Sequence, residues 1–272
     1  MSADLTNPQA DLALAGLRSL TPARVGLRRA GDSIATSELL DFQLAHARAR
    51  DAVHLRFEPS TLIAALRDQG RADALLLHSA ATDRQTYLQR PDLGRRLDEA
   101  SRIRLKNHEN SGPVYDLSLV ITDGLSALAV ERHATPLLAE LLPALARCFP
   151  QLQMAPICLV EQGRVAIGDE IARTLSASLV VVFIGERPGL SSPDSLGAYI
   201  AWRPEPGKTT DAQRNCISNI RAEGLSYPDA AARLLFYIFE ARRMQVTGVA
   251  LKEPELNEPE FPPALQLEAG KP

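Results

Sequence analysis

The chain has 272 residues, of which 45% are hydrophobic, and 30 lysines and arginines stand against 33 aspartates and glutamates. This length allows a sizeable core and two structural regions. The net charge of -3 comes with no basic field for nucleic acid and no polybasic segment for a membrane surface. No apolar run approaches the roughly 20 residues that span a bilayer. Nucleic-acid-binding and membrane proteins are therefore not expected.

The N-terminus and the cysteines indicate the compartment. The first 20 residues lack a basic stretch followed by an apolar core, so no secretory signal is expected. Cys148, Cys158 and Cys216 are scattered, which is typical of a reduced, cytoplasmic protein. Neither they nor the five histidines have metal-ligand spacing, and P-loop, GxSxG and GxGxxG motifs are missing. We therefore expect no metal ligand and no catalytic residue from this chain alone.

Residues 1–112 are expected to form a helical, charged region. Helices are predicted at 35–55, 60–67 and 92–106. Thr36 or Ser37 is the expected N-cap of the first helix, and Asp92 is expected to open the third. Arginine and alanine are plentiful in this region, so much of it should lie in water or dock against a partner.

The pattern of apolar and polar residues changes at residue 113, and residues 113–251 are expected to form an α/β domain. Strands predicted at 116–122, 154–160, 179–184 and 198–202 alternate with helices predicted at 132–149, 168–175 and 228–243. Such alternation indicates βαβ units and a mainly parallel, Rossmann-like sheet flanked by helices. The tail, residues 252–272, holds five prolines and is expected to be extended or loosely ordered.

The strand predicted at 179–184 stops abruptly at the segment GERPGL, residues 185–190. In open α/β sheets the ligand lies off the carboxyl ends of the strands. Glu186 and Arg187 at such an end therefore indicate a ligand-facing loop. The alternative is an ordinary turn in which the two side chains form a surface salt bridge worth only about 0–1 kcal/mol.

Five segments occur together in an order and spacing that is similar to one family. They are residues 87–97 (YLQRPDLGRRL), 120–126 (VITDGLS), 163–165 (GRV), 185–190 (GERPGL) and 216–220 (CISNI). The family they resemble is the small (light) subunit of ethanolamine ammonia-lyase. The resemblance covers roughly residues 80–250, and residues 23–31 (ARVGLRRAG) resemble the family's N-terminal Arg-rich loop.

The resemblance implies a heteromeric, adenosylcobalamin-dependent lyase that converts ethanolamine to acetaldehyde and ammonia by a radical mechanism. A large subunit would hold ethanolamine, and this chain would help to hold the corrinoid at the subunit interface. The cofactor would supply the chemistry, while protein supplies binding and orientation. The missing catalytic constellation is expected in such a subunit.

The resemblance also implies four corrinoid contacts. Glu186 would accept hydrogen bonds from the amides on the corrin rim. Val165 would contact the ring, and Arg164 would reach a rim carbonyl or the nucleotide-loop phosphate. Cys216 would contact the cofactor through its thiol or its backbone. Without the resemblance, Val165 is a core residue, Arg164 a solvated side chain and Cys216 a small buried hydrophobe.

Two other features set limits on the site. The segment 123–126 also follows a predicted strand, but it serves equally well as a turn and N-cap, so we leave it outside the site. The motif Asp-x-His-x-x-Gly, whose histidine binds cobalt in many cobalamin domains, is missing. The family agrees with that absence and keeps the cofactor's own base on the metal.

Two expectations remain open at this point. The competing interpretation is a stand-alone nucleotide- or metabolite-binding α/β domain, which would need neither a partner nor an apolar docking surface. Packaging into a microcompartment is disfavoured, because residues 2–10 are polar and Pro8 interrupts any helix through them.

Overall fold

The computed structural model describes residues 14–252, except residues 15, 22, 28, 72 and 110–113. The expectations for residues 2–10 and for the tail beyond residue 252 lie outside this part of the chain. The elements, in chain order, are β1 (Arg29–Ala30), β2 (Ser33–Ile34), α2 (Thr36–His54), α3 (Pro59–Asp68), β3 (Leu75–His78), α4 (Arg84–Gln89), η1 (Leu93–Arg95), α5 (Glu99–Glu109), β4 (Leu117–Thr122), α6 (Ala127–Cys148), β5 (Cys158–Glu161), α7 (Ile167–Thr174), β6 (Leu179–Gly185), β7 (Leu196–Trp202), η2 (Asp211–Gln213), β8 (Asn215–Ile220), α8 (Tyr227–Met244) and η3 (Gly248–Ala250).

Six strands form one mixed sheet in the order β3-β5-β4-β6-β7-β8. The first four of these are parallel, while β7 is antiparallel to β6 and β8 is antiparallel to β7. The expected mainly parallel α/β sheet with flanking helices is therefore confirmed. The apolar run of β6 is buried at every position, as expected for a strand that is covered on both faces.

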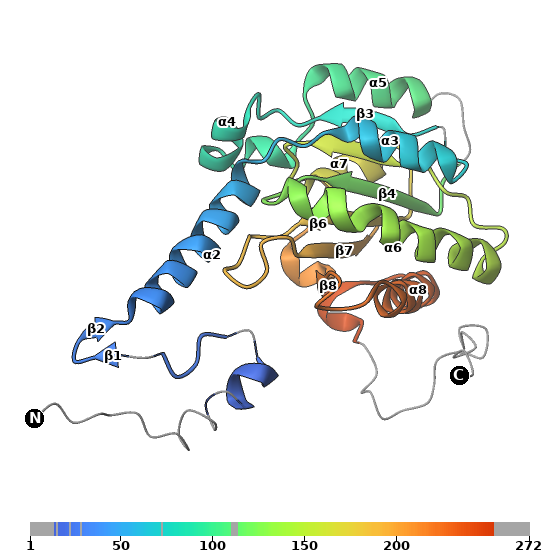
Figure 1. The fold of residues 1–272 in the computed structure, drawn as a ribbon. Helices are drawn as coiled ribbons and strands as arrows, with labels where there is room; N and C mark the ends of the chain where they lie inside the picture. Colours follow the sequence, from blue (N-terminus) through green and yellow to red (C-terminus); the bar gives the residue numbers. More distant parts are fainter. Residues whose placement is uncertain are drawn as a thin grey trace, which may run out of the picture.

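Helices cover the two faces of the sheet unequally (Figure 1). On the first face, α3, α6 and α8 pack over all of the strands from β4 to β8. On the second face, α5 and α7 pack over β3, β5, β4 and β6. The main helix contacts of β7 and β8 are with α6 and α8, so no comparable helical layer from the described residues covers the second face of these two strands.

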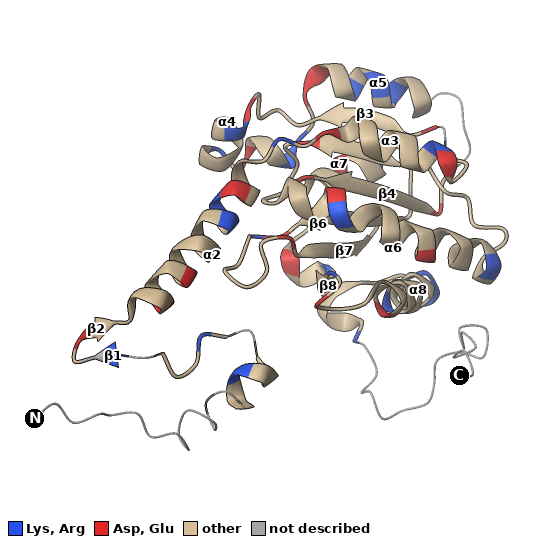
Figure 2. Ribbon diagram, viewed as in Figure 1, with Lys and Arg blue, Asp and Glu red and all other residues tan. Residues whose placement is uncertain are grey.

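Helix α2 projects from the body of the protein, and the β1–β2 hairpin lies at its far end (Figure 1). Of its 19 residues, Ala52 alone is fully buried. Acidic and basic residues both occur along α2 and along α6 (Figure 2). Within the described ranges, no helix is long and apolar enough to cross a membrane.

Some details of the helical region differ from expectation. Helix α2 begins after Ala35 without a side-chain cap, so neither Thr36 nor Ser37 is the N-cap. The helix expected at 92–106 begins only at Glu99 and is preceded by the short turn η1. The Asp98 carboxylate accepts a 2.7 Å hydrogen bond from the Ser101 backbone N–H, which satisfies a free amide at this start.

Two strands of the sheet were not predicted. Strand β3 comes from the region before residue 113 that was expected to be helical, and it is parallel to β5. Strand β8 contains the segment 216–220 and forms the other edge of the sheet. The strand expected at 154–160 is shorter and begins at Cys158.

Candidate functional site

The carboxyl ends of β4, β5 and β6 lie level with one another, because Thr122 at the end of β4 pairs with Val160 on one side and Ile184 on the other. The segments that follow, which begin at Asp123, Gln162 and Glu186, therefore leave the sheet at one edge. This is the edge at which open α/β sheets bind ligands.

Glu186 is held by three donors at this edge. Ser218 Oγ donates to its Oε1 at 2.6 Å, the Asn219 backbone N–H donates to its Oε2 at 3.3 Å, and Ser195 Oγ donates to the same Oε2. Arg187 is exposed, and the structure pairs Glu186 with hydroxyls and an amide rather than with this guanidinium. The alternative of a simple Glu186–Arg187 salt bridge does not describe these contacts.

Cys216 lies beside Glu186 on the second face of the sheet. Its Cα pairs with that of Tyr199 on β7, and the Cys216 residue is exposed. Partial removal from water raises the pKa of the Cys216 thiol, while a hydrogen bond with Tyr199 lowers it and the nearby Glu186 charge raises it. The thiol is therefore neutral at neutral pH, so it is suited to contact rather than to nucleophilic chemistry.

Val165 and Arg164 lie in the segment between β5 and α7. Gly163 anchors this segment, because its N–H donates to Thr122 Oγ1 at 3.0 Å and to Asp123 Oδ1 at 3.3 Å. Val165 is half-buried and packs against the second-face core, as Tyr199 does. The Arg164 guanidinium stacks on the ring of Tyr87 at 4.3 Å, and its Nε is buried without a hydrogen-bond partner.

A cavity of about 1020 Å³ opens beside Val165. Its walls come from η1, the start of α7 and the loop that leads to β8. Charged side chains dominate these walls: Asp92, Arg95, Arg96, Arg102, Arg164, Asp169, Glu170, Asp211 and Arg214. Both signs are present, and Val165, Ala166 and Pro206 add apolar wall, so the cavity offers charged and apolar groups together.

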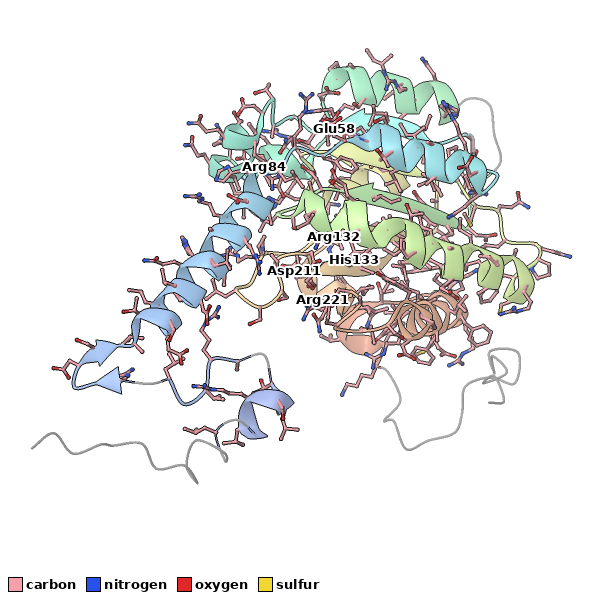
Figure 3. All side chains as sticks on the ribbon, in the orientation of Figure 1. Glu58, Arg84, Arg132, His133, Asp211 and Arg221 are labelled. Carbon is pink, nitrogen blue, oxygen red and sulfur yellow. The ribbon has the colours of Figure 1, made fainter. Side chains whose placement is uncertain are left out.

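Arg84 connects several segments at the same edge (Figure 3). Its Nη1 donates to Gly124 O at 2.8 Å and to Asp123 Oδ2 at 3.2 Å, and its Nε donates to Val53 O at 2.6 Å. Burial raises the pKa of Asp123 to about 6, and the Arg84 charge opposes this shift. Arg84 therefore links the last turn of α2, through Val53 O, to the residues that follow β4.

The segment 123–126 has the structural role that we weighed against a ligand-binding one. Ser126 is the N-cap of α6, and its Oγ accepts a hydrogen bond from the Ala129 N–H at 3.3 Å. Gly124 adopts a left-handed conformation with φ of 56°, which glycine tolerates without strain.

A second polar cluster supports the loop before β7. His133 Nδ1 lies 2.9 Å from the Tyr227 hydroxyl, and its Nε2 lies 3.4 Å from Asp194 Oδ2, to which Arg132 also donates at 2.8 Å. Arg132 and His133 follow one another near the start of α6 (Figure 3). Burial lowers the pKa of His133, against the opposing charge of Asp194. Because Asp194 precedes Ser195, this cluster helps to place a donor to Glu186.

Sequence reasoning named Glu186 and Cys216, and the structure brings these two together. Val165 packs on the same face, whereas the Arg164 guanidinium is engaged with Tyr87. The partners Ser195, Tyr199 and Arg84 were missed, because single serines, tyrosines and arginines outside a motif carry no signal. Ser218 and Asn219 could have been predicted as site residues, because both belong to the segment 216–220 that resembles the family. In the part of the chain that the structure describes, no three His, Cys, Asp or Glu side chains gather as metal ligands would.

The fold and this edge define an α/β protein whose polar loops meet at the carboxyl ends of parallel strands. Residues 12–252 match the ethanolamine ammonia-lyase light chain (EutC) family, so the chain belongs to that family. It is similar to small subunits of ethanolamine ammonia-lyase from three Pseudomonas species. The P. aeruginosa PAO1 protein is 58% identical over 240 residues, which are 87% of this chain and 86% of that protein.

The other two relatives give the same result. The P. fluorescens SBW25 protein is 56% identical over 243 residues, or 87% of this chain and 84% of that one. The P. putida GB-1 protein is 54% identical over 251 residues, or 92% and 91%. The chain is thus one subunit of a lyase, and a small subunit implies a large-subunit partner. This favours the subunit over a stand-alone binding domain.

Proposed function

We propose that this chain helps to bind adenosylcobalamin at its interface with the large subunit of ethanolamine ammonia-lyase. The single observation that carries the proposal is the Glu186–Cys216 surface on the second face of β7 and β8. Cys216 and Ser218 are exposed there, and Glu186 and Tyr199 are half-buried, although the first face of β7 and β8 is packed. A surface of this kind leaves room for a large planar ligand.

The chemistry of this surface fits a corrin macrocycle. An ionised carboxylate has about four acceptor positions, and the three donors to Glu186 leave one for a rim amide. The neutral thiol of Cys216 and the methyl groups of Val165 suit the apolar ring. Apolar walls with a few placed polar groups are typical of cofactor sites.

Arg164 is assigned the outer part of the same ligand. It lines the cavity beside Val165, and its stacking on Tyr87 holds the guanidinium plane in place. We propose that it reaches a carbonyl of the corrin rim or the phosphate of the nucleotide loop. Guanidinium groups suit phosphate because they offer several donors in a fixed plane.

When bound, adenosylcobalamin supplies radical chemistry for the conversion of ethanolamine to acetaldehyde and ammonia. The residues of this chain bind and orient the cofactor. Glu186 holds the rim, Val165 and Cys216 contact the ring, and the large subunit holds ethanolamine. We propose no residue of this chain as a ligand of the cobalt.

Helix α2 is proposed to dock on the large subunit. Most of the exposed large apolar side chains in the described part of the chain lie between residues 17 and 55. At 100° per residue, Leu39 and Phe42 lie on one side of α2 and Leu40 and Leu44 on another. A helix with two apolar sides buries both of them only in a groove that encloses it. A larger protein can form such a groove, whereas a second single helix covers only one side.

The position of α2 supports the same partner. Arg84 ties the last turn of α2 to the carboxyl end of β4, so the helix leaves the body from the edge that carries the candidate site. A subunit that covers a corrinoid at this edge therefore reaches α2 as well.

Co-expression with the large subunit tests the proposal. We expect acetaldehyde production from ethanolamine only when both chains and adenosylcobalamin are present, and we expect it in the cytoplasmic fraction. Turnover by this chain alone would contradict the proposal, as would turnover by the large subunit at the same rate without it. Binding of a nucleotide by the isolated chain, with no large-subunit complex, would favour the stand-alone domain.

A further inference from the structure

A buried ion pair joins the two segments that carry Val165 and Cys216. Arg214 Nη1 donates to Asp169 Oδ1 and Nη2 donates to Oδ2, both at 2.7 Å. The two side chains are 3% and 1% exposed, and 45 residues separate them in the chain. The pair is thus bidentate and almost completely removed from water.

Each partner is rigidly connected to its segment. Asp169 belongs to the first turn of α7, where its N–H donates to Ala166 O, and the Gly168 N–H donates to Val165 O, each at 3.2 Å. Arg214 directly precedes Asn215, whose side-chain amide donates to Leu251 O at 2.8 Å. Cys216 follows next. The distance between the Val165 segment and the start of β8 is therefore set by the ion pair.

Stability alone does not account for this pair. Burial raises the pKa of Asp169, and the hydrogen bonds and charge of Arg214 oppose that shift. Removal of two charges from water offsets much of their attraction, so an apolar pair of similar volume is often equally stable or more so. What an apolar pair cannot reproduce is the fixed geometry of two parallel hydrogen bonds.

We propose that Asp169 and Arg214 are positioning residues for the corrinoid site. Both line the cavity that Val165 and Arg164 also line, and neither is exposed enough to serve as a surface contact. The ion pair holds the ring contacts Val165 and Cys216 at the spacing that the macrocycle needs. This inference rests on the proposed function, because the spacing matters only if a corrinoid binds there.

The test replaces the pair by apolar residues in the complex with the large subunit. The double variant Asp169→Leu/Arg214→Met keeps the volume and removes the bidentate geometry. We expect its melting temperature and its affinity for the large subunit to stay near those of the wild type. We expect its Kd for adenosylcobalamin, titrated in the dark, to rise about 2- to 150-fold, the range that coupling energies between contacting groups span.

Two further variants make the test specific. Arg214→Lys keeps the charge but not the planar fork, so its Kd should lie between those of the wild type and the double variant. The control is Asp116→Leu/Arg242→Met, which removes a 3.2 Å ion pair at the start of β4, the opposite edge of the sheet. We expect the control to leave the Kd unchanged.

The outcomes separate the two proposals. If the wild-type complex binds no corrinoid, the proposed function fails. If the wild type binds it and the double variant binds it equally well, the positioning role is wrong while the proposed function stands. If the double variant does not fold, Arg214→Lys decides, because a folded Arg214→Lys complex with an unchanged Kd also contradicts the role.

Discussion

The carboxylate of Glu186 lies directly over the backbone of Gly197. A Cβ atom at position 197 would come within 2.8 Å of Oε1 and 3.1 Å of Cγ of Glu186. Glycine at this position of β7 therefore leaves the room that the Glu186 side chain occupies. The Gly197 backbone and the three donors to Glu186 together determine where the carboxylate points.

Gly197→Ala should therefore displace Glu186 while β7 still forms. We expect weaker binding of adenosylcobalamin to the complex with the large subunit and little change in subunit assembly. If the effect passes through Glu186, the double variant Gly197→Ala/Glu186→Gln should bind no more weakly than the weaker of the two single variants. If equilibrium titration showed that the losses of binding free energy of the two single variants add in the double variant, Gly197→Ala would not act through Glu186.

Glu186→Gln should weaken cofactor binding more than it weakens subunit assembly. The substitution keeps the shape of the side chain and removes the charge, so a rim hydrogen bond changes from about 1.5–3 kcal/mol to about 1. The expected loss is about 0.5–2 kcal/mol, or roughly 2- to 30-fold in Kd. Arg187→Gln is the neighbouring control and should leave the Kd unchanged. Equal affinities of wild type and Glu186→Gln would remove Glu186 from the site.

Asp123 predicts a pH dependence of stability with an unusual sign. Burial raises the pKa of this carboxyl to about 6 in the folded protein, whereas an unfolded chain has a value of about 3.9. The folded state therefore holds the proton more tightly, so this contribution to the free energy of unfolding is full below about pH 4. It is lost as the pH rises through about 6.

The measurement compares wild type with Asp123→Asn, which does not titrate, by urea unfolding between about pH 4 and 7. The difference in unfolding free energy, wild type minus variant, should fall with rising pH by up to about 3 kcal/mol. Asp83→Asn is the control of opposite sign, because hydrogen bonds from Thr86 and Thr82 lower the pKa of Asp83. A pH-independent difference for Asp123→Asn would contradict the prediction.

Helix α2 can be tested separately from the cofactor. Leu40→Glu and Phe42→Glu place a charge on each of its two apolar stripes, at residues that are 58% and 42% exposed. Because neither side chain belongs to the core, we expect an unchanged melting temperature and a weaker affinity for the large subunit. Ile103→Glu on α5, which is 53% exposed, is the matched control. Equal losses in all three variants, measured by sedimentation or titration of the large subunit, would show that α2 has no special role.

Much of the central fold could be predicted because its elements have strong periodic signals. The apolar run of β6 and the long amphipathic pattern of α6 lie close to their expected positions. The start of α6 was set too late, because Ser126 caps the helix before the region where its pattern is most regular. The resemblance of five ordered segments to one family supplied what periodicity could not, which is the function.

The missed elements have weak local signals. Strand β3 has only four residues and is stabilised by pairing with β5, which lies about 80 positions further along the chain. Strand β8 alternates buried and exposed residues irregularly, and its pairing with β7 contains a register shift. Its exposed residues Cys216, Ser218 and Asn219 belong to the surface that we propose for the ligand. In the site, the Asp169–Arg214 pair depends on tertiary contact that no spacing in the sequence reveals.

Strands β3 and β8 form the two edges of the sheet, and such edges affect whether the free chain aggregates before it binds a partner. An unpaired strand edge can template association with other chains, and proteins block it with charge, irregular pairing or cover. At β3, Arg104 of α5 reaches over and donates to the Leu76 carbonyl. At β8, exposed Ser218 and Asn219 and the register shift against β7 do the same without a covering helix. The surface that we propose for the cofactor and the large subunit therefore also carries features that oppose strand-to-strand aggregation of the free chain.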